Sequence, residues 1–63
     1  MKNLYLATTD DNSTHLLIVA DSFSSALDVA TENIAFGQSI GEVDFICVAG
    51  GDYDSAQVIK VIK

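Results

Sequence analysis

The chain lacks most of what small folds use to gain stability or to perform chemistry. Its 63 residues include one cysteine, so no disulfide can form within the chain. One cysteine and one histidine also do not make a structural zinc site. There is no arginine, and three lysines stand against nine carboxylates, whereas contact with nucleic-acid phosphates needs positive charge. We therefore expect no metal, no cofactor and no direct binding of nucleic acid.

Long apolar runs are missing as well. No stretch approaches the ~18 apolar residues that span a bilayer, and the N-terminus MKNLYLATT has no apolar run long enough for a signal peptide. These absences predict a soluble, cytoplasmic protein with no membrane contact. A chain of 63 residues is expected to form one domain, residues 1–63, near the lower size at which a single core suffices. Association with another chain is then the remaining source of added stability.

One segment has a clear helical period: SFSSALDVATENIAFG, from Ser22 to Gly37. Apolar residues recur there at i, i+3, i+4, i+7 and i+11, which places them on one face of a helix: Phe23, Ala26, Leu27, Ala30 and Ile34. Ser22 can cap the first turn, and Gly37 can take the left-handed conformation that closes a helix. The pattern predicts a helix from about Phe23 to Ala35.

Four short apolar segments surround this helix and are typical of strands: 2–9, 14–20, 42–49 and 56–63. The last, AQVIKVIK, could also form a short helix, but its valines and isoleucines favour a strand. The order β-β-α-β-β indicates a single small α+β domain. With the third strand placed beside the first, we expect an antiparallel sheet of order 2-1-3-4 and the helix packed on one face.

One helix covers only one face of such a sheet, yet three of its strands are apolar on both faces. Strict alternation leaves an uncovered set that includes Tyr5, either Leu17 or Ile18, Ile46, Val48 and part of the group Val58, Ile59, Val61 and Ile62. At roughly 25 cal/mol per Å², several such side chains left in water would forfeit several kcal/mol. We expect another chain to cover the open face or the last strand. The alternative is a strongly twisted sheet over which the end of the chain folds.

Carboxylates gather in two turns and at the start of the third strand. Asp52 and Asp54 begin like a calcium loop, but the other ligands of that pattern are absent. Nothing supplies a nucleophile or an activated base, so we expect no enzyme. The acids could meet a basic surface on another protein, or only maintain solubility. The predicted partner-binding residues are Asp10, Asp11, Glu42, Asp44, Asp52, Asp54, Tyr5, Ile46, Val48, Ile59 and Val61.

The stretch LYLATTDDNSTHLLIVADSFSSALDVA, from Leu4 to Ala30, combines an aromatic strand, an acidic turn, an apolar strand and Ala-Asp-Ser before the helix. It resembles small ββαβ proteins encoded by bacteriophages, and its layout is similar to that of the short RNA-polymerase inhibitor of T7-like phages. That inhibitor carries arginines on its third strand, where this chain has Asp44 to Val48 and none, so its mode of polymerase binding does not carry over. The resemblance implies a host-directed protein that occupies a surface of a bacterial enzyme.

Two functional hypotheses follow. The first is a small acidic, non-enzymatic interaction protein, phage-encoded, that works in the host cytoplasm. It would bind and modulate or inhibit a host protein with a basic surface, such as a nucleic-acid-handling enzyme like RNA polymerase. The second is a self-associating homodimer, formed through the open sheet or the last strand, with no foreign partner.

Overall fold

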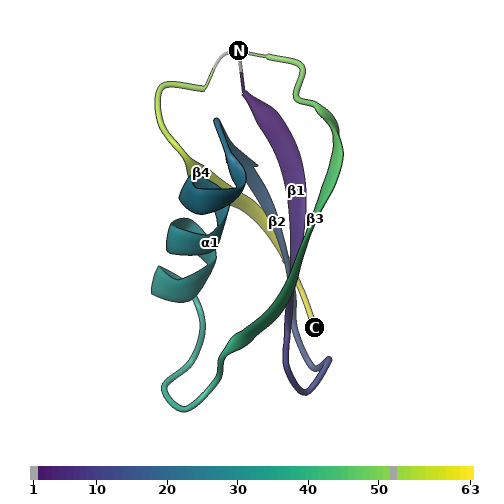
Figure 1. Ribbon diagram of the computed structural model, residues 1–63, viewed down its shortest axis with the longest axis vertical. Coiled ribbons are helices and arrows are strands. Elements are labelled where there is room, and N and C mark those ends of the chain that lie inside the picture. The colour runs from purple at the N-terminus through teal and green to yellow at the C-terminus, as the bar shows by residue number, and fades with distance from the viewer. Residues whose placement is uncertain (1, 52) are drawn as a thin grey trace.

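The computed structural model describes residues 2–51 and 53–63 as one four-stranded antiparallel sheet with a helix on one face (Figure 1). The elements are β1 (Asn3–Thr9), β2 (His15–Ala20), α1 (Phe23–Glu32), β3 (Ile40–Val48) and β4 (Gln57–Ile62). The predicted α+β class and the β-β-α-β-β order are confirmed, and the C-terminal segment is a strand. Within the described residues, no helix has the length and apolar character needed to cross a membrane.

The strand order is β3-β1-β2-β4, so the predicted order 2-1-3-4 is wrong in the position of the last strand. β3 pairs with β1 as expected, but β4 pairs with β2 and not with β3. The physical reason lies in β2, whose sequence HLLIVA is apolar on both faces. A strand of this kind gains most from neighbours on both sides, and in the interior of the sheet four of its side chains are fully buried: Leu16, Ile18, Val19 and Ala20.

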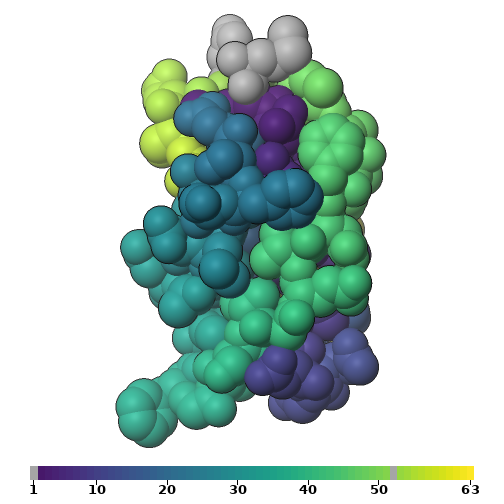
Figure 2. Space-filling view, viewed as in Figure 1, coloured from purple at the N-terminus to yellow at the C-terminus, as the bar shows by residue number. Residues whose placement is uncertain are grey.

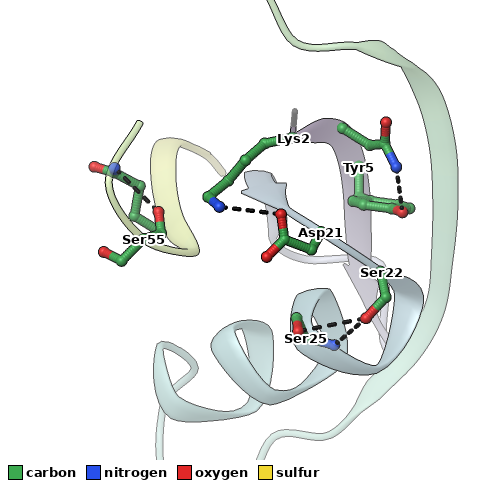
Figure 3. A network of polar contacts seen from close by, with 8 residues as sticks. Lys2, Tyr5, Asp21, Ser22, Ser25 and Ser55 are labelled. Atoms are coloured by element: carbon green, nitrogen blue, oxygen red, sulfur yellow. Dashed lines mark hydrogen bonds and ion pairs between the residues drawn. The ribbon is translucent and has the colours of Figure 1, made fainter. Parts of the chain in front are cut away.

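The connection from β3 to β4, described over residues 49–51 and 53–56, lies at the end of the sheet where β1 begins (Figure 1). The Ala49 N–H donates to the Lys2 carbonyl at 3.0 Å and fixes the start of this connection. Lys2 also forms an exposed ion pair, with 3.0 Å between its Nζ and Asp21 Oδ1 (Figure 3). An exposed pair of this kind contributes little stability, but it joins the start of β1 to the end of β2.

α1 begins where the sequence predicts. The Ser22 backbone is extended, and its Oγ accepts a hydrogen bond from the Ser25 N–H at 3.2 Å, which caps the first turn (Figure 3). The helix ends at Glu32, three residues before the predicted Ala35, because the Asn33 N–H bonds to the Ala30 carbonyl in a tighter final turn.

The core lies between α1 and the face of the sheet formed by alternate residues of β1 and β2. Ala26 and Ala30 are fully buried and allow the helix to approach the sheet closely. The buried residues beneath the helix are Tyr5, Ala7, Leu16, Ile18 and Ala20. Ile34 packs against this core as predicted, whereas Phe23 and Leu27 stay about half exposed, so the predicted helix face is confirmed in part.

The prediction that places Tyr5 on the uncovered face is wrong. Tyr5 is 2% exposed, and its ring lies between those of Phe23 and Phe45, with centroid distances of 4.9 and 5.9 Å. Its hydroxyl accepts a hydrogen bond from Asn3 Nδ2 at 3.1 Å (Figure 3). The helix presents small alanines to the sheet, so a large ring on β1 fills the space beneath it.

The structure also shows which of Leu17 and Ile18 lies on the open face of the sheet. Ile18 faces the helix as part of the core, which puts Leu17 on the opposite, open face of the sheet. Leu17 pairs there with Leu6 of β1. The open face is therefore apolar in its centre, along β1 and β2.

Candidate functional site

The β1–β2 turn is held together by its own side chains. Asp11 Oδ1 accepts hydrogen bonds from the Ser13 hydroxyl at 2.7 Å, the Thr9 hydroxyl at 2.8 Å and the Ser13 N–H at 3.1 Å. Asn12 takes a φ of 59°, a left-handed conformation in which asparagine is enriched. The hydrogen bonds from Ser13 and Thr9 lower the pKa of Asp11 from 3.8 to about 2. Asp11 is therefore ionised throughout the physiological range.

This lowered pKa predicts a pH-dependent contribution to stability. Because the pKa is about 2 in the folded chain and near 3.8 in the unfolded chain, the stabilisation is fully present above pH 3.8 and is lost as the pH falls towards 2. Asp11→Asn should therefore lower the melting temperature at pH 7, and the difference from wild type should shrink on acidification. Thermal melts between pH 7 and pH 2, followed by circular dichroism, measure this difference.

Asp28→Asn is the matched control, because Asp28 is an exposed helix carboxylate whose side chain makes no hydrogen bond among the described residues. It should leave the melting temperature at pH 7 nearly unchanged. A deficit in Asp11→Asn that is as large at pH 2 as at pH 7 would contradict the role of the ionised carboxylate.

The segment between α1 and β3 carries the most exposed large apolar side chain in the described part of the chain, Phe36. Phe36 occupies the second position of a turn in which the Gln38 N–H donates to the Ala35 carbonyl at 3.0 Å. Gly37 follows with a φ of 90°, the conformation that a type II turn requires at its third position. The ring extends from this turn fully into solvent.

The side chain of Gln38 braces this turn from two directions. Its Oε1 accepts a hydrogen bond from the Ala35 N–H at 3.1 Å, and its Nε2 donates to Ser13 Oγ at 3.1 Å. A further backbone bond joins the same two segments, from the Asp10 N–H to the Ser39 carbonyl at 2.9 Å. The loop that carries Phe36 is thus tied to the acidic β1–β2 turn.

Both turns lie at the same end of the molecule, the lower end in Figure 1. Glu42 follows on β3, opposite Thr8 of β1, close to the point where β3 begins. We call this end the acidic tip and define it by Asp10, Asp11, Phe36 and Glu42. It combines three carboxylates with one exposed aromatic ring on a hydrogen-bonded support.

The structure does not gather all the predicted acids on one surface. Asp44 lies two residues beyond Glu42 on β3, with Leu6 as its neighbour on β1. Asp54 is exposed in the connection between β3 and β4, at the opposite end of the molecule from the acidic tip. Asp52 lies outside the described residues. The acidic turns therefore point in opposite directions.

The predicted apolar contacts divide between the two edges of the sheet. Ile46 and Val48 are half exposed on β3, and Ile59 and Val61 are similarly exposed on β4, with β1 and β2 between them. Ile46 and Ile59 are the extra residues of irregularities in the two edge pairings, which shift the register. Val48 and Val61 consequently lie on the helix side of the sheet and not on its open face, since their partners there are Asn3 and Leu16.

On α1, β3 and the loop between them, four exposed large apolar residues were missed as possible contacts. Phe23, Leu27 and Phe45 lie along α1 and β3, which run side by side on the face seen in Figure 2. Phe36 lies on the loop after α1, which projects from the lower end of the same view. The sequence contained a signal for Phe36. It is an aromatic residue that falls outside the helical period and directly precedes a glycine, so it belongs to no predicted buried face of a helix or strand.

The described residues hold neither a pocket nor a group of three or more His, Cys, Asp and Glu side chains placed to bind a metal ion. His15 Nδ1 lies 3.1 Å from the Thr8 hydroxyl, and Cys47 is exposed beside Leu4.

Comparison with known proteins gave no match to a family model, a curated protein or a solved structure. The resemblance to phage-encoded ββαβ proteins stays a prediction. The functional argument therefore rests on the residues of the surface.

Proposed function

We propose that this chain is a small acidic interaction protein without catalytic activity, and that it binds through the acidic tip. The observation that carries the proposal is Phe36, a fully exposed ring on a turn fixed by four hydrogen bonds. Single exposed apolar residues are ordinary on protein surfaces. Phe36 differs because the side chain of Gln38 and a second turn hold its support in place, and an aromatic ring on a pre-organised support is a typical binding anchor.

The charges around Phe36 indicate the chemistry of the partner. Asp11 is ionised at physiological pH, Asp10 and Glu42 lie at the same end, and the whole chain carries a net charge of −6. The complementary surface is an apolar pocket for the ring with lysine and arginine side chains at its rim. Enzymes that handle nucleic acids carry basic grooves for phosphate. A bacterial enzyme of this class, with RNA polymerase among the candidates, is the proposed target, and occupation of its groove is the proposed mode of inhibition.

Capture from a bacterial lysate tests this proposal when wild type and Phe36→Ala are immobilised side by side. The expected partner is retained by the wild type, lost from the variant and released as the salt concentration rises, since salt screens exposed charges. The same set of captured proteins on both surfaces would overturn the proposal.

Self-association is the second candidate function, and the exposed apolar residues on both edges of the sheet favour it.

A further inference from the structure

Both edges of the sheet are open within residues 2–51 and 53–63. β3 and β4 each pair on one side only, so each presents backbone N–H and C=O groups along its outer side. Both edges also carry large apolar side chains that are about half exposed: Phe45, Ile46 and Val48 on β3, and Ile59, Val61 and Ile62 on β4. Exposed edges of this composition favour pairing with another strand.

Rows of cross-strand neighbours connect the two edges through the interior of the sheet. One row crosses the open face through the partners Asp44, Leu6, Leu17 and Lys60. The adjacent row crosses the helix side through the partners Val43, Ala7, Leu16 and Val61. The first row therefore ends in a carboxylate at one edge and an ammonium group at the other, and the second ends in a valine at each edge.

We propose that the β4 edge of one copy of the chain binds the β3 edge of a second copy, so that the sheet continues along the same rows. Because all three pairings within the sheet are antiparallel, β4 runs antiparallel to β3. When a second copy is placed next to the first along the direction of the rows, β4 of the first copy therefore pairs antiparallel with β3 of the second. Lys60 then lies opposite Asp44 of the second copy, and Val61 lies opposite Val43 of the second copy.

The backbone pattern is compatible with this junction. In an antiparallel ladder, hydrogen-bonded and non-hydrogen-bonded pairs alternate along each strand and from one strand to the next within a row. The sheet has four strands, an even number. In each row, the backbone N–H and C=O groups of the β4 residue and of the residue opposite it on a second β3 therefore either both point towards the junction or both point away from it. No shift of register is needed to match the hydrogen bonds and the side chains together.

Charge favours this head-to-tail arrangement over a symmetric one. β3 paired with β3 of a second copy in this region would bring Glu42 and Asp44 of the two copies together, and β4 paired with β4 about Lys60 would bring two lysines together. In the described part of the chain the one ion pair is Lys2–Asp21, so Lys60 is not already neutralised there. The head-to-tail contact leaves one open edge at each end, so it adds copies without closing.

Sedimentation velocity between micromolar and millimolar protein tests the arrangement. The wild type is expected to grow in mass with concentration and to pass beyond two copies. Lys60→Glu and Asp44→Lys should each sediment as monomers, because each places like charges at the junction. An equimolar mixture of the two variants should associate again, since every junction between unlike variants then pairs opposite charges. Circular dichroism verifies that each variant is folded.

The double variant Asp44→Lys, Lys60→Glu keeps the net charge at −6 and should associate like the wild type, which separates the local pair from total charge. A wild type that stays monomeric at millimolar concentration, or that stops at a dimer, overturns the proposal. Association that survives both single changes, or folded variants that fail to associate on mixing, does the same. Phe36→Ala should leave self-association unchanged, so this result is independent of binding through the acidic tip.

Discussion

Tyr5→Ala is expected to lower the free energy of unfolding by about 3–5 kcal/mol, the usual range for truncating a buried aromatic side chain. The ring is 2% exposed and packs between Phe23 and Phe45, at centroid distances of 4.9 and 5.9 Å. A domain of this length has a total stability of about 3–9 kcal/mol. The change should therefore remove a large part of the total stability, and it would unfold the chain at 25 °C if that total lies near the lower end of the range. Urea denaturation followed by circular dichroism measures the loss directly.

Two further variants keep this prediction testable even where Tyr5→Ala does not fold. Tyr5→Phe retains the ring and loses only the hydroxyl that accepts from Asn3, so it should cost about 1 kcal/mol. Phe36→Ala removes a ring of similar size from full solvent exposure and should change stability by less than about 0.5 kcal/mol. If Tyr5→Ala were as mild as Phe36→Ala, Tyr5 would be a surface residue and its place in the core would be wrong.

Phe36→Ala is expected to have the opposite profile, with stability unchanged and affinity for the captured partner lowered by about 30-fold or more. A binding hot spot contributes at least about 2 kcal/mol on truncation to alanine, which corresponds to this factor. Titration calorimetry or surface plasmon resonance at fixed salt measures the affinity. Asp28→Ala is the matched control, because Asp28 is exposed on α1 and outside the acidic tip.

An unchanged affinity in Phe36→Ala would remove the anchor role of the ring. The dissociation rate should carry most of the loss, since mutations in one interface act mainly on dissociation. Because Phe36→Ala changes no charge, a loss confined to the association rate would contradict an anchor role of the ring in the bound complex.

The helix could be predicted from the sequence because its signals are local. Ser22 caps the first turn, and the apolar period continues to Ile34, so neither signal depends on where the strands lie. The strands themselves were equally visible as short apolar segments. Which face of β1 meets the helix could not be predicted. Alternation places Leu4 and Leu6 on one face and Tyr5 and Ala7 on the other, and because all four are apolar, it does not indicate which face belongs to the core.

The position of β4 depends on a choice between two edges that lie far apart in sequence. β2 and β3 both offered an edge, and the sequence contains no turn that selects one of them, since residues 49–56 are long enough to pass over the end of the sheet. The composition of β2 was the available signal, because a strand apolar on both faces favours an interior place. The irregularities at Ile46 and Ile59 shift residues between faces, and strict alternation does not reveal them.

Part of the candidate site was visible in the sequence and part was not. Asp10, Asp11 and Glu42 were predicted as contacts and lie together at the acidic tip, because the β1–β2 turn and the start of β3 are joined by the bond from Asp10 to Ser39. Asp54 lies at the opposite end because β3 runs antiparallel to β1, and the predicted antiparallel sheet already implied this separation.

The central claim, that the chain acts by binding through the acidic tip, is tested most directly by site-specific photo-crosslinking in a bacterial lysate. A benzophenone side chain is placed at position 36 in one sample and at position 28, on the exposed side of α1, in another. We predict that position 36 forms one dominant crosslink, to a protein with a basic surface, and that position 28 does not. Equal labelling from both positions, or no crosslink from position 36, would contradict the claim.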